Sequence, residues 1–291
     1  MAVQAGINST QINDTILASG IAQFIVPTPM STPLYEVLCM QHDCRNLKSN
    51  VLDIPRWDPF PATEETTEGD EVVSVNYATS KKSITGVMYS TRALITDQAI
   101  QDSMLLQSDM VGQMAANISN TLDQEGLGLF VGATNAADHS GVNLTIALWQ
   151  AALAAFRAFR PVGEIAFVAS TNQMRDFMKD LIVVGGAAPV AGSANPVFQT
   201  MNIDGYRQAW GGVHLFESAN ITQYDASNDN GGFVALSPTL KGFSMGVWSG
   251  IEAGGLYTPH RHGYDTTVGA RAGFVRTAEH LVYGFISKKA A

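Results

Sequence analysis

TDQAIQDSMLLQSDMVGQMAANISNTLDQEGLGLF, from Thr96 to Phe130, is the longest regular stretch of the chain. Its apolar residues recur every three or four positions, as on one face of an α-helix. They are Ile100, Met104, Val111, Ala115, Ile118, Leu122 and Leu129. Thr96 or Asp97 is predicted to cap the first turn, and two glycines, Gly126 and Gly128, to mark the end. A helix of about thirty residues would be roughly 45 Å long, so we expect a spine on which the rest of the chain is arranged.

Length and composition limit the classes of protein that fit. The chain has 291 residues, 46% of them hydrophobic, which is enough for a large core. A net charge of −9 argues against tight binding to a phosphate backbone. There is no apolar run of eighteen residues and no secretory signal at the start, so a cytosol-like compartment is expected. With only Cys39 and Cys44, a disulfide framework is not indicated, and buried thiols are expected.

The part of the chain before the spine is predicted to lack a core of its own. Prolines interrupt residues 1–58, which we interpret as an extended arm lying on the body or on a neighbouring subunit. After an acidic stretch, Glu71–Ala78 and Ser83–Ala93 have strand composition, and ATSKKS lies between them as a turn. This predicts a long β-hairpin. A two-stranded ribbon is marginal alone, so we expect it to lie against another chain, with an ordinary sheet edge as the alternative.

The part after the spine is predicted to form a compact α/β unit. Thr145 is positioned to cap a helix, IALWQAALAAFRAF, that is apolar almost all round and therefore expected to be buried between other elements. A strand follows at Glu164–Ala169, and Ser170 with Gln173 predicts a capping box for the helix TNQMRDFMKDLI. Residues 183–196 form a Gly, Ala and Pro loop. Strands are expected from Phe198 onward, with AGFVRTA and HLVYGFIS in central positions.

One motif suggests enzyme chemistry. Gly242–Gly246 matches the G-x-S-x-G elbow of serine hydrolases, and Asp265 and His280 follow Ser244 in the order of a catalytic triad. The elbow needs a strand-to-helix turn, whereas Phe243, Met245 and Val247 alternate as one face of a strand. We therefore favour a strand at this position and predict no catalytic residue.

Two histidine-containing clusters could suggest a metal. Cys39, His42 and Cys44 have no further ligands at a matching spacing, and His260 with His262 lacks a third ligand nearby in sequence. A surface turn after Pro259 is the expected setting for the second pair. No phosphate-binding loop or dinucleotide fingerprint is present in the sequence. No metal or cofactor site is therefore predicted.

The predicted order of elements resembles the major capsid protein of tailed bacteriophages, with the α+β fold of the Hong Kong 97 type. The resemblance covers nearly the whole chain. It is carried by SITGVMYSTRALITDQAIQDS, LDQEGLGLFVG, ALAAFRAFRPVGEIAFVASTNQMRDFMKDL and RHGYDTTVGARAGFVRTAEHLVYGFI.

The resemblance implies a division of the chain into five parts. These are an N-terminal arm (1–58), an extended loop with the β-hairpin (59–95), a peripheral domain with the spine helix (96–140), an axial domain (141–261), and closing strands of the peripheral domain (262–291). The extended loop would lie over the adjacent subunit. The expected contact residues on it are Val75, Tyr77, Lys81, Lys82, Val87 and Tyr89.

The resemblance also implies a function without catalysis. The subunit would form hexamers and pentamers of an icosahedral head shell around double-stranded DNA, in the virion, after assembly in the bacterial cytoplasm. Expected partners are further copies of itself, a separate scaffolding protein, a portal, a decoration or cement protein, and loosely contacted DNA, with no membrane partner. Some relatives are crosslinked through a loop lysine. Lys81 and Lys82 match that lysine only in their expected position, so exposed charges at a turn are the preferred interpretation.

Three alternatives stay open at the level of the sequence. An encapsulin-like bacterial nanocompartment shares the fold and would differ in its contents. A serine hydrolase would use Ser244. A soluble ligand-binding α/β protein would be a monomer with a saturable pocket.

Overall fold

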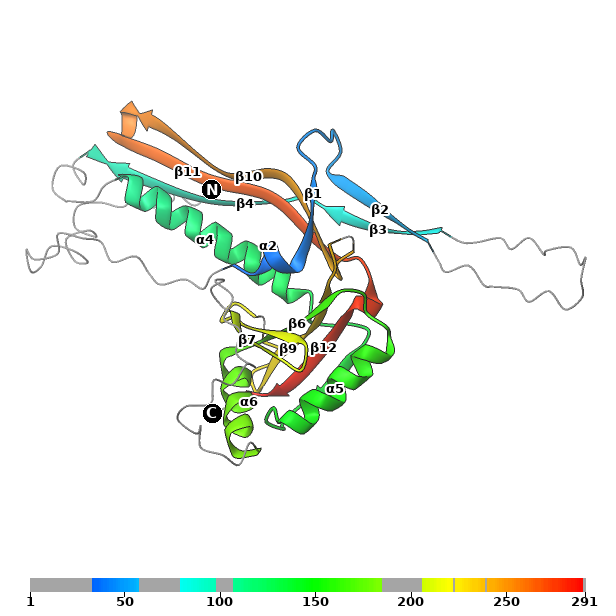
Figure 1. The fold of residues 1–291 in the computed structure, drawn as a ribbon. Helices are drawn as coiled ribbons and strands as arrows, with labels where there is room; N and C mark the ends of the chain where they lie inside the picture. Colours follow the sequence, from blue (N-terminus) through cyan, green and yellow to red (C-terminus); the bar gives the residue numbers. More distant parts are fainter. Residues whose placement is uncertain are drawn as a thin grey trace, which may run out of the picture.

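The structure is a computed structural model that describes residues 33–57, 79–97, 107–184, 206–221, 223–238 and 240–289. Figure 1 shows a body with two β-sheets, a long helix beside one of them, and a narrow two-stranded ribbon that projects from the body.

The spine is helix α4 (Gln107–Gly128). Its 22 residues correspond to about 33 Å at the usual helical rise. The residues that it buries include Met114, Ile118 and Leu122, which confirms the predicted face in the described part of the helix. Thr96 is the last residue of a strand and Asp97 is helical, but the turn that either was predicted to cap continues outside the described residues, so this cap stays a prediction. Ile100 and Met104 lie outside the described residues.

A four-stranded sheet lies against the spine. Its order is β1 (Cys39–Asp43), β10 (Phe243–Thr258), β11 (Gly263–Arg276) and β4 (Val87–Thr96). Strand β1 runs parallel to β10, and the other two pairings are antiparallel. The tip of the β10–β11 hairpin holds a short 3-10 helix, η2 (Pro259–Arg261). The pairing of β10 with β11 shifts register on both sides of Ser249, so β10 bulges where it passes the end of α4.

A six-stranded sheet forms the second half of the body. Its order is β5 (Ala136–His139), β12 (Val282–Lys288), β9 (Asn228–Leu236), β6 (Glu164–Ala169), β8 (Val213–Glu217) and β7 (Tyr206–Trp210). Helices α5 (Ile146–Ala158) and α6 (Thr171–Val184) contribute to the aromatic core on one face of this sheet, and η3 (Glu279–Leu281) joins β11 to β12. The predicted helix, strand and helix are confirmed.

The caps of both helices follow the sequence prediction. The side chain of Thr145 accepts a hydrogen bond from the backbone N–H of Leu148 at the start of α5. At the start of α6, Ser170 N–H donates to Oε1 of Gln173, and Gln173 N–H donates to Oγ of Ser170. This reciprocal pair is a capping box. Both caps could be predicted because each is formed within four consecutive residues.

Strand β6 separates two cores. Phe167 faces a cluster with Trp149, Phe156 and Phe233, whereas its neighbour Val168 belongs to the cluster that includes Leu122 of the spine. Successive strand residues point to opposite faces, so both faces of this sheet are buried. This explains the uninterrupted apolar run EIAFVA. One core thus continues from the spine into the six-stranded sheet.

Helix α5 is not buried on all sides, as its composition suggested. Trp149, Leu153 and Phe156 face the aromatic core. The opposite face is exposed and carries mostly alanine: Ala147, Gln150, Ala151 and Ala154. Alanine is compatible with either environment, and this is why hydrophobic composition alone gave the wrong prediction.

The described part of the N-terminal arm packs on the body, one of the two predicted settings, because the short helix α2 (Tyr35–Leu38) and β1 contact the spine and β10. Two strand placements differ from the predicted division of the chain. Strand β10, expected with the axial unit, belongs to the four-stranded sheet. Strands β5 and β12, expected with the peripheral unit, belong to the six-stranded sheet. The strands expected to be central, β11 and β12, do lie inside their sheets.

Candidate assembly surfaces

The ribbon consists of β2 (Val51–Trp57) and β3 (Thr79–Thr85), which pair antiparallel from Val51–Thr85 to Trp57–Thr79. Residues 58–78 join the two strands. The predicted hairpin, with a turn at 79–82, is therefore wrong in its register. Strand β3 pairs with a segment before the acidic stretch, and β4 pairs with β11 instead. In Figure 1 the ribbon extends away from both sheets.

The root of the ribbon is fixed to the body by close contacts. Ile84 is fully buried in a small cluster with Cys44 and Trp248. The backbone of β11 also approaches very closely, since a Cβ built at Gly273 would lie 2.1 Å from the carbonyl oxygen of Thr85. A Cβ at Gly86 would lie 2.8 Å from the Trp248 ring. Only glycine fits at these two positions, so the direction of the ribbon is set where it leaves the sheet.

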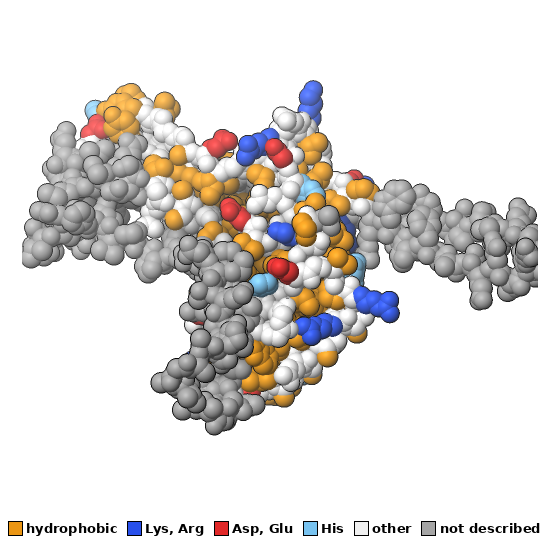
Figure 2. Space-filling model, in the orientation of Figure 1, with side chains coloured by type: hydrophobic (Ala, Val, Ile, Leu, Met, Phe, Trp, Pro, Cys, Tyr) orange, Lys and Arg blue, Asp and Glu red, His pale blue; other side chains and the backbone are white. Residues whose placement is uncertain are grey.

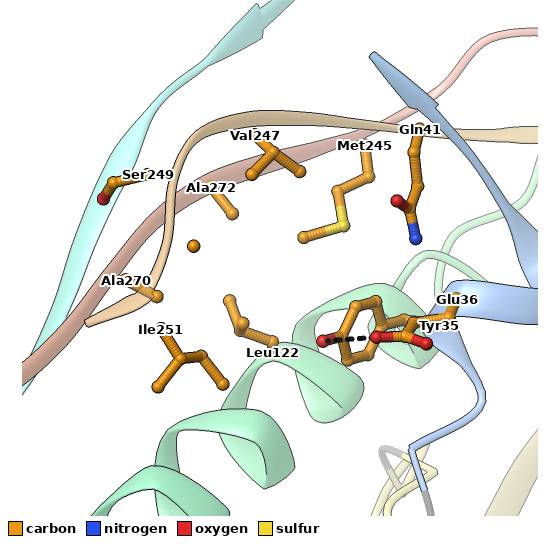
Figure 3. Close-up of a pocket in the computed structure, with 11 residues that line it drawn as sticks. Tyr35, Glu36, Gln41, Leu122, Met245, Val247, Ser249, Ile251, Ala270 and Ala272 are labelled. Atoms are coloured by element: carbon orange, nitrogen blue, oxygen red, sulfur yellow. Dashed lines mark hydrogen bonds between the residues drawn. The ribbon is translucent and has the colours of Figure 1, made fainter. Parts of the chain in front are cut away.

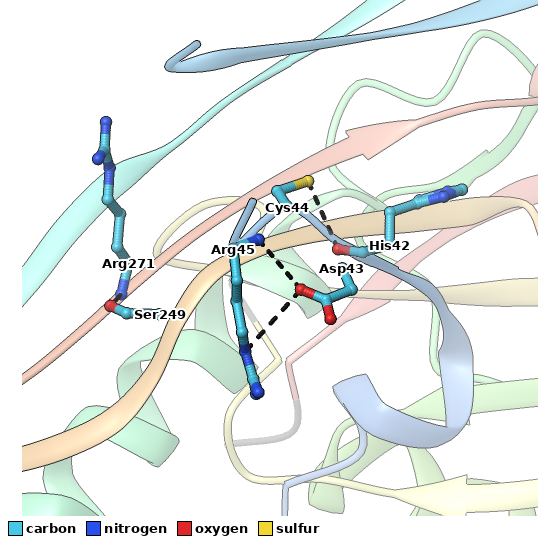
Figure 4. A network of polar contacts seen from close by, with 6 residues as sticks. All are labelled: His42, Asp43, Cys44, Arg45, Ser249 and Arg271. Atoms are coloured by element: carbon cyan, nitrogen blue, oxygen red, sulfur yellow. Dashed lines mark hydrogen bonds and ion pairs between the residues drawn. The ribbon is translucent and has the colours of Figure 1, made fainter. Parts of the chain in front are cut away.

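Polar contacts hold the turn between β1 and β2 to the same root. The Trp248 indole N–H donates to the carbonyl oxygen of Ser49 at 2.8 Å, and Nη2 of Arg271 donates to Oδ1 of Asn50 at 2.5 Å. Asn50 in turn accepts from the backbone N–H of Gly86. Figure 4 shows Arg271 next to Ser249 at the bulge of β10, and Arg45 on the turn with its side chain extending in the opposite direction. The turn and the ribbon therefore form one connected unit.

The two lysines proposed as contact residues lie within β3 and not at a hairpin tip. Nζ of Lys81 is 2.7 Å from Oδ2 of Asp53 on the opposite strand, on the exposed side of the ribbon. Lys82 points the other way and lies 3.7 Å from Oε1 of Glu279 in η3. This ion pair links the ribbon to the connection between the two sheets, where Arg276 also approaches Glu279.

The other proposed contact residues have different environments. Val87 is exposed on β4, next to the ribbon root. Tyr89 is half-buried and packs on the core beside the spine, and burial raises the pKa of its hydroxyl. Tyr89 therefore stabilises the subunit itself. Val75 and Tyr77 lie outside the described residues.

Asp123 is a buried carboxylate on α4 that was not predicted from the sequence. Its Oδ1 accepts hydrogen bonds from the backbone N–H groups of Leu34 and Tyr35, at 2.6 and 3.0 Å, and its Oδ2 accepts from Nδ2 of Asn220 at 2.9 Å. Burial raises the pKa of Asp123, while these three hydrogen bonds act in the opposite direction. One side chain thus joins the spine to the N-terminal segment and to the loop after β8.

Lys241 holds the other end of α2. Its Nζ donates to the carbonyl oxygens of Val37 and Cys39, and burial lowers the pKa of Lys241. A carboxylate at the N-terminus and a cation at the C-terminus match the polarity of the helix, although α2 has only four residues. The two contacts fix the N-terminal segment where it joins the body.

A cavity of about 300 Å³ lies between α2, the end of α4 and the bulge of β10. Figure 3 shows Leu122, Met245 and Ile251 lining it, with Tyr35 and Glu36 at one side. The walls are mostly apolar, and the Tyr35 hydroxyl donates to Glu36 at 3.5 Å. Such a pocket lacks the convergent polar groups typical of a catalytic site.

The elbow motif does not assemble a triad. Ser244 is buried in the middle of the four-stranded sheet, and its Oγ accepts a hydrogen bond from the hydroxyl of Thr277 at 2.5 Å. Ser244 pairs with Val275, whereas Asp265 lies ten residues further along the same strand, about 33 Å at the usual rise. There Asp265 forms an ion pair with Arg92. The geometry contradicts the hydrolase alternative built on Ser244.

The histidines and cysteines considered as metal ligands do not gather into one site in the part of the chain that the structure describes. His260 and His262 are exposed at the tip of the β10–β11 hairpin, as expected. Both cysteines are free and buried, also as expected, and burial raises the pKa of the Cys39 thiol to about 12. Within the described ranges, no group of three or more metal-ligating side chains occurs. Among the helices in those ranges, none is long and apolar enough to span a bilayer.

In Figure 2, charged side chains are scattered among hydrophobic ones over the face that is shown. Large exposed apolar residues occur near the ribbon root and at the β10–β11 tip, and they include Leu47, Val87, Met88, Leu256 and Tyr257. These surfaces, together with the ribbon, are the candidate contacts between subunits.

Several solved phage structures have a similar arrangement. A structure described as Mycobacterium phage Che8 has a TM-score of 0.67 at 10% identity, covering 91% of this chain and 94% of the other. The cyanophage Pam1 capsid has a TM-score of 0.67 at 12% identity over 100% of both chains. The head of Helicobacter pylori bacteriophage KHP40 has a TM-score of 0.66 at 9% identity over 98% of both. A comparison with curated proteins finds no match.

The fold is therefore that of the Hong Kong 97 type of viral shell subunit. A family model described as phage capsid protein matches residues 81–285, and the chain belongs to this family. It is a structural major capsid protein of a phage head shell. The predicted resemblance and fold class are confirmed.

Proposed function

We propose that this subunit assembles into hexamers and pentamers that close an icosahedral shell around double-stranded DNA, with the ribbon lying over the neighbouring subunit. The observation that carries the proposal is the β2–β3 ribbon, whose strands pair only with each other among the described strands. A two-stranded ribbon is marginally stable in water. Its closely held root and its lack of a third strand support a role in contacting a second copy.

The proposal extends to the partners and the place of assembly. A separate scaffolding protein, a portal and a decoration or cement protein would join the shell, which is assembled in the bacterial cytoplasm and becomes part of the virion. The net charge of −9 supports a loose contact with packaged DNA, because strong phosphate binding requires clustered cations. Regions 96–140 and 141–261 would retain their peripheral and axial roles, with the strand assignments given above.

The test is a variant that lacks the segment joining the two ribbon strands. Because Trp57 and Thr79 are paired, residues 58–78 can be replaced by Asn-Gly, which favours a two-residue hairpin turn. We expect a folded, soluble subunit that does not form closed shells. Folding of the variant and the wild type would be compared by circular dichroism, and their shells by negative-stain microscopy. Normal shells from this variant would contradict the contact of the extended loop with the neighbouring subunit, and wild-type shells filled with protein cargo would favour a nanocompartment.

A further inference from the structure

Strand β4 is the longest edge strand of the two larger sheets among the described strands. It lies at one end of the four-stranded sheet and pairs with β11 on one side only. The other edge strands are short: β1 and β7 have five residues each and β5 has four, whereas β4 has ten. Short edges limit pairing with other chains. The ten-residue edge of β4 instead offers a long row of backbone groups to a further strand.

The register of β4 on β11 fixes which of its backbone groups point outward. The N–H of Asp97 donates to the carbonyl oxygen of His262, and from this point the pairing runs to Val87 without a register shift. In an antiparallel ladder, hydrogen-bonded pairs alternate with pairs that are not hydrogen-bonded. The odd-numbered residues from 87 to 97 therefore bond to β11. The N–H and C=O groups that point away from the sheet belong to Met88, Ser90, Arg92 and Leu94.

Strand β4 also lacks the devices that usually keep an edge strand unpaired. Its sequence, VMYSTRALIT, contains no proline and no lysine, and its pairing with β11 has no bulge. Its one charge, on Arg92, is engaged by Asp265. Val87 and Met88 are 48% and 59% exposed. The described part of helix α4 packs mainly on β10 and β11, so it does not cover the outer edge of β4.

The sequence of β4 complements itself in one antiparallel register. When Thr91 lies opposite Thr91 of a second copy, Met88 lies opposite Leu94. In the same register Ser90 lies opposite Arg92, so all the outward-pointing groups meet in hydrogen-bonded pairs. A register centred on Arg92 would place two like charges opposite each other, and one centred on Ser90 would place Arg92 opposite Met88. Apolar cross-strand pairs stabilise a sheet and like charges destabilise it, so the register centred on Thr91 is favoured.

We propose that β4 pairs antiparallel with β4 of a second copy around a two-fold axis at Thr91. The two four-stranded sheets would then form one continuous sheet, with both spine helices on the same face. Neighbours within a hexamer or pentamer ring are not related by a two-fold axis, so this isologous contact joins subunits of adjacent rings. Its place between rings rests on the proposed function, whereas the pairing of the two strands does not.

A cysteine at the two-fold axis tests the pairing and its register. Thr91 would face its own copy in a pair that is not hydrogen-bonded, where the Cα atoms are about 4.5 Å apart and a disulfide can form. In the control, Ser90→Cys, the two copies of position 90 are displaced by about 7 Å along the strands, which is too far. After oxidation of assembled shells with diamide, we expect about tenfold more covalent dimer from Thr91→Cys on non-reducing gels. The native thiols are buried and are present in both variants.

A proline at an outward-pointing position tests the consequence for assembly. Ser90→Pro removes an N–H that points away from β11, so the subunit should keep its own sheet and melt close to the wild-type temperature. The proline ring would block the second strand. We expect rings to form, but the subunit concentration needed for closed shells to rise about tenfold or more, because pairing would leave buried backbone groups unsatisfied. Ser90→Ala keeps the N–H and should assemble normally.

The outcomes separate this pairing from the proposed function. Absence of covalent dimer from Thr91→Cys, or equal amounts from both cysteine variants, would overturn the pairing, as would normal shells from a folded Ser90→Pro variant. If Ser90→Pro does not fold, the crosslink alone decides. If the wild type forms no shells, the crosslink is measured on the concentrated subunit. A dimer specific to Thr91→Cys would then support the pairing while the proposed function fails.

Discussion

At the scale of single residues, Asp123 contributes stability that no local pattern indicates. Replacing it with alanine removes the acceptor of three buried donors, each of which costs about 1–3 kcal/mol when unsatisfied. We expect Asp123→Ala to lower the free energy of unfolding of the subunit by about 3 kcal/mol or more in urea titrations. Glu125→Ala, an exposed position on the same helix, is the control and should change it little. Equal stability of the two variants would contradict the role of Asp123 in holding α2 against the spine.

The raised pKa of Asp123 also gives a pH dependence of defined sign. Because the folded protein holds this proton more tightly than the unfolded chain does, the stabilising contribution is complete below the unfolded pKa of about 3.9 and is lost as pH rises through the folded value. The difference in unfolding free energy between the wild type and Asp123→Asn should therefore decrease as pH rises through that window. Urea titrations from acid to neutral pH would measure it. A difference that is constant, or that increases with pH, would contradict the assigned shift.

The residue scale also shows which contacts the sequence could predict. The caps at Thr145 and Ser170 involve partners three residues away, so their spacing was visible. Asp123 bonds to residues 88 and 89 positions earlier, and in the sequence it was one polar residue among several on the helix. A carboxylate on the apolar side of the helix, next to Leu122, was the only signal that could have identified it. Its partners depend on the tertiary fold.

At the scale of elements, amino-acid composition predicted the positions of the strands well, but it predicted poorly which strands pair with each other. Residues 79–85 and 87–96 do form strands, yet β3 pairs with β2, and β4 pairs with β11, which is distant in sequence. Gly86 separates β3 from β4 where the Trp248 ring leaves no room for a side chain. A single glycine in a strand-like run indicates a break only weakly. The prediction of one continuous strand from 83 to 93 failed at this glycine.

A second close approach, between Gly273 and the backbone of Thr85, supports a prediction for the ribbon. Gly273→Ala would place a Cβ 2.1 Å from the Thr85 carbonyl oxygen, which is backbone and cannot rotate away. We expect the ribbon root to separate from β11, at a cost of about 3 kcal/mol, near the upper end for an overpacked site. Cleavage of the ribbon in limited proteolysis should become faster. Gly254→Ala, with no atom within 4 Å, is the matched control in the neighbouring strand. Equal cleavage rates for both variants would show that the root is not tightly held.

At the scale of the whole molecule, one of the two cores joins both halves of the body, and the ribbon projects from this body. The spine packs on the four-stranded sheet and on the inner face of the six-stranded sheet, so the two halves share the cluster that contains Leu122 and Val168. The sequence supported this arrangement because the spine, the helix–strand–helix unit and the closing strands each have a strong local pattern. It could not assign β5 and β12 to their sheet, since each pairs with strands far away in sequence. It also separated β10 from its hairpin partner β11 by a domain boundary predicted at residue 261.

Glu279 occupies the point where three parts of this molecule meet. It lies on η3 between β11 and β12, 3.7 Å from Lys82 of the ribbon and 3.8 Å from Arg276, and Thr134 donates to its Oε2. These contacts are partly exposed, so their main effect should be on the angle of the ribbon and less on stability. We expect Glu279→Ala to fold normally but to give shells with a broader distribution of diameters in electron micrographs. Asp53→Ala, which removes the ion pair of Lys81 within the ribbon, is the control and should leave the distribution narrow. If both variants give equally uniform shells, the ribbon angle is set by the root alone.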